Sequence, residues 1–355
     1  MFEITTEAPV LVTGATGFVA GWIVKALLEA GVTVHATVRD PTDTGRLEPL
    51  DKIAQAAPGA IRYFRADLLE NGTFEEAMAG CRIVFHTASP FTSRISDPQR
   101  DLVDPALLGT RNVLSAVERS DSVQRLVLTS SVVAMYGDAA DLAALPGQVL
   151  TEAAWNTTSS VAHQAYSYSK TVAEKEAWAM HGAQSRWSLV VINPALVLGP
   201  SVAGVSTSES HNLIRQIADG TLKTGAPPIT LGVVDVRDVA TAHLRAAFDA
   251  AAEGRHIVSA ESRTFLDLAR MLRLEFGERW PFPKSEAPKW LVWLAGPMID
   301  KSITRRFVAR NLGYPWKADN SKSKQALGLQ YSPISKAVVD MFRQMVDTGS
   351  LRAPG

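Results

Sequence analysis

The sequence predicts an α/β fold, with a doubly wound parallel sheet and a smaller, mostly helical C-terminal lobe. Two observations support this fold class. Short apolar, β-branched runs alternate with helix-like stretches through the first half of the chain, and this alternation loosens after Pro194. Strands connected by helices pair in parallel, through crossovers that are almost always right-handed.

The expected elements follow from this alternation. Strands are expected at residues 9–13, 32–38, 61–64, 83–86, 126–129 and 188–192, with 233–236 and 256–258 returning to the sheet. Helices are expected at residues 18–30, ended by Gly31, and at 105–118, 165–181 and 239–251. A loop and a short helix reach Asp219, a turn-rich stretch follows to 232, and residues from 264 onward are helical and irregular.

Composition excludes several classes of partner. The 355 residues contain 36 acidic and 36 basic side chains, so no net charge attracts nucleic acid or an anionic membrane. Cys81 is the single cysteine, which rules out an intrachain disulfide and suits a reducing cytoplasm. The longest apolar run, 290–299, is interrupted by Gly296-Pro297, and the N-terminus lacks a basic signal-peptide region. We expect a cytoplasmic protein without nucleic-acid or membrane partners.

A glycine-rich turn, residues 12–20, joins the first strand to the first helix. Gly14 permits a turn that a side chain would resist, Gly17 allows close approach of a pyrophosphate, and Ala20 lets the helix pack on the strand. The helix N-terminus then attracts phosphate. A generic strand-to-helix turn is the alternative, but the position favours a Rossmann-type dinucleotide site. Its expected contacts are Gly14, Thr16, Gly17, Phe18 and Val19.

The second strand ends with Arg39 and Asp40. A guanidinium can bind a 2′-phosphate in a bidentate manner, whereas a carboxylate at this place binds the ribose hydroxyls of NAD. Arg39 comes first, so we expect NADP(H) to be preferred; Asp40 leaves NAD(H) open. A solvated loop position is the alternative interpretation of Arg39. We assign residues 1–193 and 233–259 to the dinucleotide-binding domain, and 194–232 and 260–355 to a substrate-binding lobe.

Tyr166 and Lys170 are four residues apart near the start of an expected helix, and so share one face. A nearby ammonium stabilises a phenolate and is expected to lower the pKa of the tyrosine, which can then exchange a proton with a carbonyl oxygen. A hydroxyl from Thr129-Ser130-Ser131, at the end of the fifth strand, can stabilise charge on that oxygen. The alternative is an exposed pair on a helix. Tyr168 has no lysine four residues later and is expected to pack.

Together these motifs resemble the extended short-chain dehydrogenase/reductase family, in its dihydroflavonol reductase, cinnamoyl-CoA reductase and aldehyde reductase branch. The segments that carry the resemblance are residues 12–17, 38–41, 84–90, 109–114, 128–131, 166–170, 193–200 and 236–240. The resemblance implies that Ser131, 35 residues before Tyr166, is the catalytic serine. It also implies cofactor contacts from Asp67 and Leu68 near the adenine, from Thr87, Ala88 and Ser89 near the ribose, and from Pro194 and Val197 near the nicotinamide. Thr129, Tyr166 and Lys170 are further expected cofactor contacts, with Lys170 on the nicotinamide ribose. Asp67 could instead cap a helix, and Asn193 is expected to hold a backbone turn.

Departures from the family patterns limit the substrate. Dihydroflavonol reductases carry Asn or Asp where this chain has Tyr136, and cinnamoyl-CoA reductases carry Asn-Trp and Cys where it has Gln164, Ala165 and Ser167. The resemblance therefore implies interconversion of a ketone or aldehyde of moderate size and its alcohol, by a monomer or homodimer. The rival functions are an NAD-dependent nucleotide-sugar epimerase or dehydratase, and a non-catalytic NADP-binding protein.

Two further sets of residues have open roles. His86, His163 and His211 lie in different elements without metal-ligand spacing, so we expect no metal site, although His163 and His211 could border the substrate. Four aromatic residues of the second lobe form either an apolar lid or ordinary core: Trp280, Phe282, Trp290 and Trp293.

Overall fold

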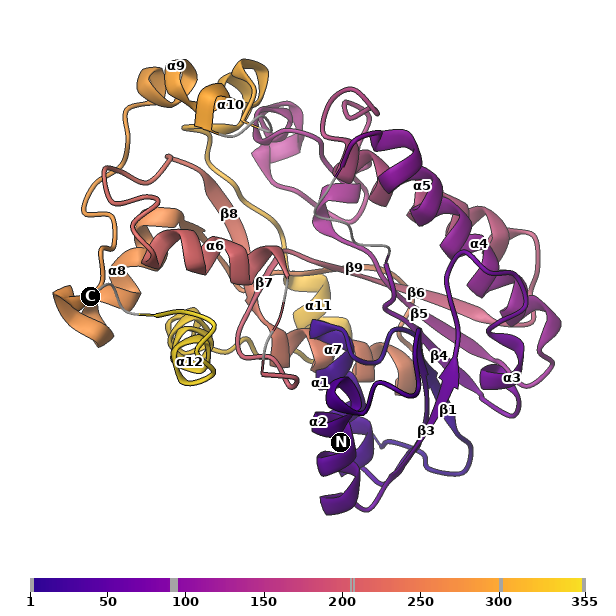
Figure 1. The fold of residues 1–355 in the computed structure, drawn as a ribbon. Helices are drawn as coiled ribbons and strands as arrows, with labels where there is room; N and C mark the ends of the chain where they lie inside the picture. The colour runs from indigo at the N-terminus through magenta and orange to yellow at the C-terminus, as the bar shows by residue number, and fades with distance from the viewer. Residues whose placement is uncertain (1–2, 90–94, 205, 207, 300–302, 353–355) are drawn as a thin grey trace.

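A computed structural model describes residues 3–89, 95–204, 206, 208–299 and 303–352. Within these residues seven strands form one parallel sheet in the order β3-β2-β1-β4-β5-β6-β9 (Figure 1). The strands are β1 (Val10–Val12), β2 (Thr33–Val38), β3 (Ala60–Arg65), β4 (Ile83–His86), β5 (Arg125–Thr129), β6 (Ser188–Pro194) and β9 (Gly254–Val258). The order in which the strands are added reverses between β1 and β4. Parallel sheets of this kind bind ligands at this place, beyond the carboxyl ends of their strands. The expected fold class is confirmed.

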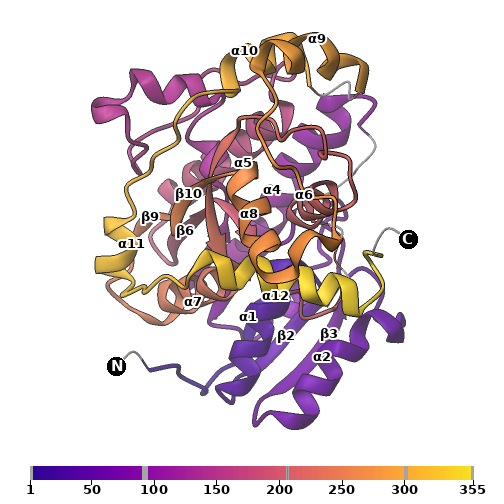
Figure 2. The same cartoon turned by 90° about the vertical axis from the view of Figure 1, so that its left-hand side faces the viewer.

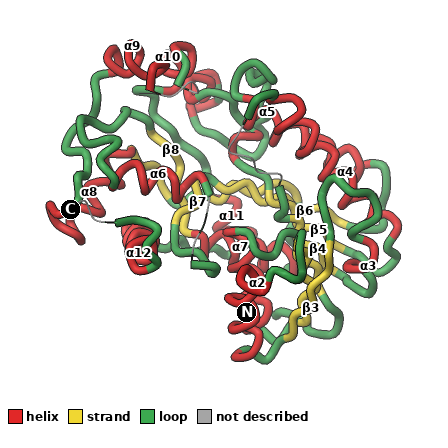
Figure 3. Tube along the Cα trace, in the orientation of Figure 1, coloured by secondary structure: helices red, strands yellow, loops and turns green. Residues whose placement is uncertain are grey.

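Helices cover both faces of this sheet (Figure 3). One layer contains α1 (Phe18–Glu29), α2 (Thr44–Ala56) and α7 (Val236–Phe248), and the other contains α3 (Glu75–Met78), α4 (Asp104–Arg119) and α5 (Ala165–Gly182). A π-helix at Gln99–Val103 leads into α4, and 3₁₀ helices occupy Val132–Ala134, Ala139–Ala144 and Pro146–Gln148 between β5 and α5. Each layer encloses its own apolar core against the sheet. α1 ends before Gly31, whose φ of +85° suits glycine.

The second lobe contains a small sheet in the order β10-β8-β7. Its strands are β7 (Leu196–Leu198), β8 (Thr230–Asp235) and β10 (Glu261–Thr264), and its helices are α6 (Glu209–Ala218), α8 (Phe265–Phe276), α9 (Lys289–Ile299), α10 (Arg305–Asn311), α11 (Ser321–Ala326) and α12 (Ile334–Asp347), with a 3₁₀ turn at Gly277–Arg279. Its core surrounds Phe342, which contacts Phe276, Trp280 and Phe282. Both views place α9 and α10 together at one end of the molecule (Figures 1 and 2).

One expectation about strand pairing is wrong. Residues 256–258 return to the main sheet as part of β9, but the strand expected at 233–236 lies in β8, which pairs with β7 and β10. β9 already occupies the edge next to β6. Trp316 also packs directly on β8 at Gly232, where a Cβ would lie only 2.2 Å from its ring.

Neither a membrane span nor a clustered metal site is present in the part of the chain that the structure describes. No helix there is both long and apolar enough to cross a bilayer. The same residues contain no group of three or more His, Cys, Asp or Glu side chains arranged to hold a metal ion.

Candidate active site

The glycine turn forms a cradle at the carboxyl end of β1. Gly14 has a φ of +63°, and a Cβ there would lie 3.1 Å from the Cβ of Ala88. A Cβ on Gly17, the residue before α1, would lie 3.1 Å from the carbonyl oxygen of Gly14. The positive φ of Gly14 favours glycine there, and a side chain at either position would force its neighbour to shift by a few tenths of an ångström. The backbone N–H groups of the first turn of α1 remain available for an anion such as a pyrophosphate.

The ends of β1 and β4 are joined by hydrogen bonds to Thr13. Its hydroxyl accepts from the backbone N–H groups of Thr87 (3.1 Å) and Ala88 (3.0 Å), and its carbonyl accepts from the Thr87 hydroxyl at 2.5 Å. The Thr13 hydroxyl also shares a 3.0 Å hydrogen bond with Nδ1 of His86. Burial, with a smaller contribution from Lys170, lowers the pKa of His86 to about 3, so the ring is neutral. Thr87 and Ala88 therefore lie directly beside the glycine turn.

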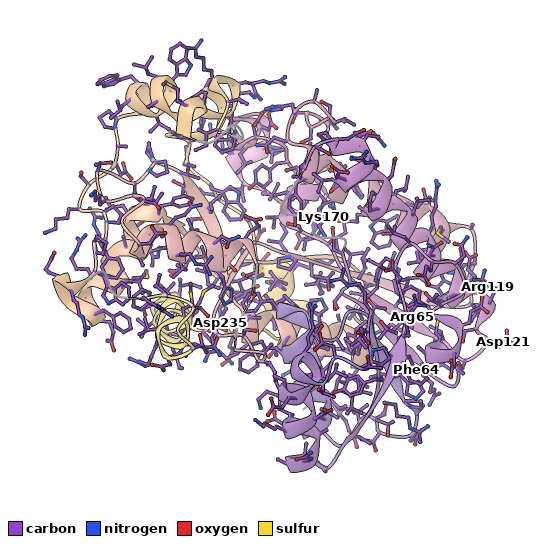
Figure 4. All side chains as sticks on the ribbon, in the orientation of Figure 1. Phe64, Arg65, Arg119, Asp121, Lys170 and Asp235 are labelled. Atoms are coloured by element: carbon purple, nitrogen blue, oxygen red, sulfur yellow. The ribbon has the colours of Figure 1, made fainter. Side chains whose placement is uncertain are left out.

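Lys170 connects the expected catalytic helix to the same place. Its Nζ donates to the Ser89 hydroxyl at 2.9 Å and lies 5.7 Å from the centroid of the Tyr166 ring. Burial lowers the pKa of Lys170 to about 8. Figure 4 shows Lys170 between α5 and the second lobe. The structure thus brings together Tyr166, Lys170 and Ser89.

The pKa of Tyr166 moves opposite to the expected direction. The side chain is 48% exposed, yet the protein that surrounds it limits solvation and raises its pKa to about 12, and the Glu209 carboxylate adds to the rise. The lowering expected from Lys170 is not found, because burial dominates the pKa of this phenol; the Lys170 amine instead donates to Ser89. Glu209 begins α6, so the electrostatic effect also identifies a residue of the second lobe that the sequence analysis missed.

The two serines after β5 have different environments. Ser130 is buried and donates its hydroxyl to the Glu174 carboxylate. Ser131 is partly exposed, and its hydroxyl makes long contacts, accepting from the Val133 N–H at 3.3 Å and donating to the Pro194 carbonyl at 3.5 Å. Of the two, Ser131 therefore has the hydroxyl that is less engaged by the protein.

Glu174 is a buried carboxylate that the sequence analysis did not identify. It accepts from Asn193 Nδ2 at 2.8 Å and from Ser130, and it lies 2.6 Å from Nε of Arg255 on β9. Asn193 Nδ2 also donates to the Ser131 carbonyl at 3.2 Å, consistent with the expected role of Asn193 in holding backbone. In the sequence, the feature that could have identified Glu174 is its position four residues after Lys170, on the same face of the helix.

A hollow of about 380 Å³ lies between β4, β5 and α5 and opens to solvent. Residues of β4, β5, α4 and α5 line it, and five expected cofactor contacts are among them: Leu68, Ala88, Ser89, Thr129 and Lys170. Thr129 donates its hydroxyl to Nε2 of His243 at 2.7 Å, because Nδ1 of that ring donates to the Val239 carbonyl. Its polar lining also includes His86, Thr110, Ser130 and Glu174.

A second, smaller hollow brings an unexpected arginine to the glycine turn. Arg46, in the first turn of α2, lines it together with Thr16 and Gly17. Arg39 and Asp40 are both exposed after β2. Asp40 accepts from the Thr42 hydroxyl (2.6 Å) and N–H (2.8 Å), which lower its pKa, so this carboxylate is already bound within its own turn.

Comparison with known proteins identifies the family. A sequence model of the NAD dependent epimerase/dehydratase family matches residues 10–259. This chain belongs to that family. A cinnamoyl-CoA reductase of Medicago truncatula is 39% identical over 270 residues, covering 74% of this chain and 79% of the relative. A dihydroflavonol 4-reductase of Zea mays is 35% identical over 280 residues, covering 77% and 75%. The crystal structure of Gre2 from Candida albicans in complex with NADPH has a TM-score of 0.75 at 28% identity and covers 96% of this chain and 98% of its own. The resemblance stated from the motifs is confirmed.

The remaining expected positions of this epimerase/dehydratase family member lie as follows. Asp67 accepts the N–H of Leu69 at 2.9 Å, which forms a local turn. Pro194 ends β6 in a buried position, and Val197 lies half-buried in β7. Phe18 and Val19 begin α1 and are partly buried. Pro90, at the end of the segment 84–90, lies outside the described residues.

The structure separates the histidines and aromatic residues whose roles were left open into buried and exposed groups. His163 is buried on Asp138, and His211 packs edge-on against Phe18 with 5.1 Å between ring centroids. Trp280 and Phe282 are core residues of the second lobe, whereas Trp290 and Trp293 are 68% and 42% exposed on α9. The four aromatics therefore do not form one lid.

Proposed function

We propose that the chain is an NADPH-dependent reductase that interconverts a ketone or aldehyde and the corresponding alcohol. The observation that carries the proposal is the hydrogen bond between Lys170 and Ser89, which brings the helix of Tyr166 to the glycine turn. The likeness to a solved reductase in complex with NADPH supports the cofactor. NAD(H) is an alternative cofactor of lower affinity.

The glycine positions fit a dinucleotide, because Gly14 adopts a positive φ and neither glycine adds a side chain where a phosphate would approach the backbone. Gly14, Gly17 and the first turn of α1 would hold the pyrophosphate. Arg39 and Arg46 would hold the 2′-phosphate of NADPH, because guanidinium groups bind phosphate oxygens in pairs. The engagement of Asp40 with Thr42 supports this preference over NAD.

When bound, NADPH supplies a hydride to the carbonyl carbon. A phenol with a raised pKa stays protonated at neutral pH, so Tyr166 can donate its proton to the carbonyl oxygen, which balances the added hydride to give the alcohol. Lys170 would hold the nicotinamide ribose and restore the proton on Tyr166. The hydroxyl of Ser131 would donate a hydrogen bond to the same carbonyl oxygen.

The substrate is proposed to be a carbonyl compound of moderate size. Tyr136 lies at the position where relatives that reduce flavonoids carry an amide or a carboxylate. It is 9% exposed, and its ring centroid lies 6.3 Å from that of Trp316. This apolar packing replaces a polar contact for substrate hydroxyls. Location in the cytoplasm and a monomeric or homodimeric state belong to the same proposal, the first resting on the single buried cysteine.

The test measures NADPH oxidation with a panel of aryl ketones and aldehydes. Tyr166→Phe is expected to lower kcat by about 10²–10⁴-fold, because general acid catalysis contributes that much. Tyr168→Phe, two residues further on the same helix, is the control and is expected to retain activity. Arg39→Ala should raise KM for NADPH more than for NADH. Equal turnover by wild type and Tyr166→Phe would contradict the proposal, and tightly co-purifying NAD without carbonyl reduction would favour an epimerase.

A further inference from the structure

The buried carboxylate of Asp138 binds the two residues that precede α5, the helix that contains Tyr166. Asp138 is 0% exposed, and four side chains donate to it. Its Oδ2 accepts from Nε2 of His163 at 2.8 Å and Nε of Arg310 at 2.6 Å, and its Oδ1 accepts from Nδ2 of Asn311 at 2.8 Å and Nε2 of Gln164 at 3.3 Å. A carboxylate with four donors has its hydrogen-bonding capacity filled.

Two of these donors are His163 and Gln164, which precede α5. Gln164 has φ 56° and ψ 49°, the left-handed conformation that side chains other than glycine rarely adopt. Such a conformation persists only where neighbouring contacts hold it. His163 forms two backbone hydrogen bonds with Ser160, at 2.8 and 3.0 Å. The direction in which α5 starts, and hence the place of Tyr166, depends on this turn.

The other two donors belong to α10 of the second lobe. Arg310 also donates to Oδ1 of Asp141 at 2.5 Å, and Oδ1 of Asn311 accepts the N–H of Ala139 at 2.9 Å. α10 therefore binds both the carboxylate and the backbone next to it. The contacts between α10 and the segment 138–141 span about half the length of the chain in sequence.

The carboxylate is held in its ionised form. Burial acts to raise the pKa of Asp138, but the hydrogen bonds from His163, Asn311, Arg310 and Gln164 outweigh it and leave the pKa below its ordinary value. A protonated or neutral replacement would lose at least one of these acceptor contacts and leave Arg310 without part of its counter-charge.

We infer that Asp138 is a positioning residue for Tyr166: through His163 and Gln164 it fixes the turn that starts α5, and through Arg310 and Asn311 it makes that turn depend on α10. The inference rests on the proposed function, since it requires Tyr166 to be the proton donor. A shift of the phenol of about 1 Å can lower a rate about a hundredfold.

The experiment compares Asp138→Asn and Arg310→Gln with Arg306→Gln, a control at an exposed arginine of the same helix. Steady-state kinetics, fluorescence titration with NADPH, and the isotope effect from NADPH deuterated at the transferred hydrogen are measured for each. Asp138→Asn is expected to lower kcat about ten- to a hundredfold with the NADPH Kd unchanged within about twofold. The isotope effect should rise, because a displaced proton donor slows the chemical step. Arg306→Gln should match the wild type.

The outcomes separate this inference from the proposed function. If Asp138→Asn lowers Tm but leaves kcat and the isotope effect of the folded protein at wild-type values, while Tyr166→Phe is inactive, the positioning role is wrong and the proposed function stands. If Tyr166→Phe is active, the proposed function fails first and the inference fails with it. If Asp138→Asn does not fold, Arg310→Gln decides, because this side chain is 39% exposed whereas that of Asp138 is fully buried; an unchanged kcat there overturns the inference.

Discussion

At the scale of single residues, Lys170 has the pKa most directly relevant to the proposed chemistry. Burial moves it from an ordinary 10.5 to about 8 in the folded chain. Below pH 8 both folded and unfolded chains carry the proton, and the cost of burying the charge is fully present. Between about 8 and 10.5 the unfolded chain binds more protons, so this residue contributes a rise in stability with pH. Above that window the contribution is constant.

The same pKa predicts unusual reactivity toward an amine-directed acylating reagent. At pH 8 about half of the Lys170 side chains are neutral and nucleophilic. Labelling of the peptide that contains Lys170, followed by mass spectrometry from pH 6 to 10, should rise with a midpoint near 8. Lys52, 70% exposed, is the reference in the same digest. NADP⁺ should protect Lys170 and leave Lys52 unchanged; a midpoint above 10 would contradict the predicted burial effect.

The candidate residues that the sequence could group together are close in the chain. Gly14 and Gly17 share one turn, and Tyr166 and Lys170 share one helical face, so spacing together with the surrounding motifs predicts that they lie together. The direction of the Tyr166 pKa could not be predicted, because it depends on burial by surrounding protein and on Glu209 in the other lobe, 43 residues away in sequence. Asp138 was missed for the same reason, since its partners in α10 are remote in sequence.

At the scale of elements, Glu174 joins α5 to the carboxyl ends of β5 and β6 and to the first residues of β9. It contacts Ser130, Asn193 and Arg255, which lie at or after these strands. Arg255 is 7% exposed, and its guanidinium also stacks 4.0 Å from the Trp155 ring. The carboxylate thus holds the element that carries Tyr166 against the one that carries Ser131.

Glu174→Gln is expected to reduce both stability and activity. The replacement preserves size but leaves the buried Arg255 without its counter-charge, which costs about 3–5 kcal/mol in such pairs. Denaturant unfolding measures this loss, and kcat should fall as Ser131 shifts. Glu176→Gln on the same helix breaks a pair with the half-exposed Arg111 and should cost under about 1 kcal/mol. Equal effects of the two variants would show that Glu174 is not special.

The place of β8 shows where local pattern is insufficient. β8 was expected in the main sheet, and which sheet a strand joins depends on partners such as Trp316 over Gly232.

At the scale of the whole molecule, α12 connects the second lobe to α7, which packs on the seven-stranded sheet. Arg237 of α7 pairs with the buried Asp235 and with Asp340 of α12. Ser332, just before α12, donates to Asp238 at 2.7 and 2.9 Å. These bonds predict that the two parts unfold together.

Phe342→Ala tests this prediction from the centre of the second lobe. The side chain is fully buried among Phe276, Trp280 and Phe282, and its loss should cost about 3–5 kcal/mol, the range for large aromatic truncations. Because α12 ties the lobes, far-UV circular dichroism and the fluorescence of the buried Trp280 and Trp187 should shift to lower denaturant together, as one transition. Leu274→Ala, at a position 91% exposed on α8, should shift it by less than about 0.5 kcal/mol. Fluorescence changing well before circular dichroism would mean that the second lobe melts by itself, and that α12 does not couple the two.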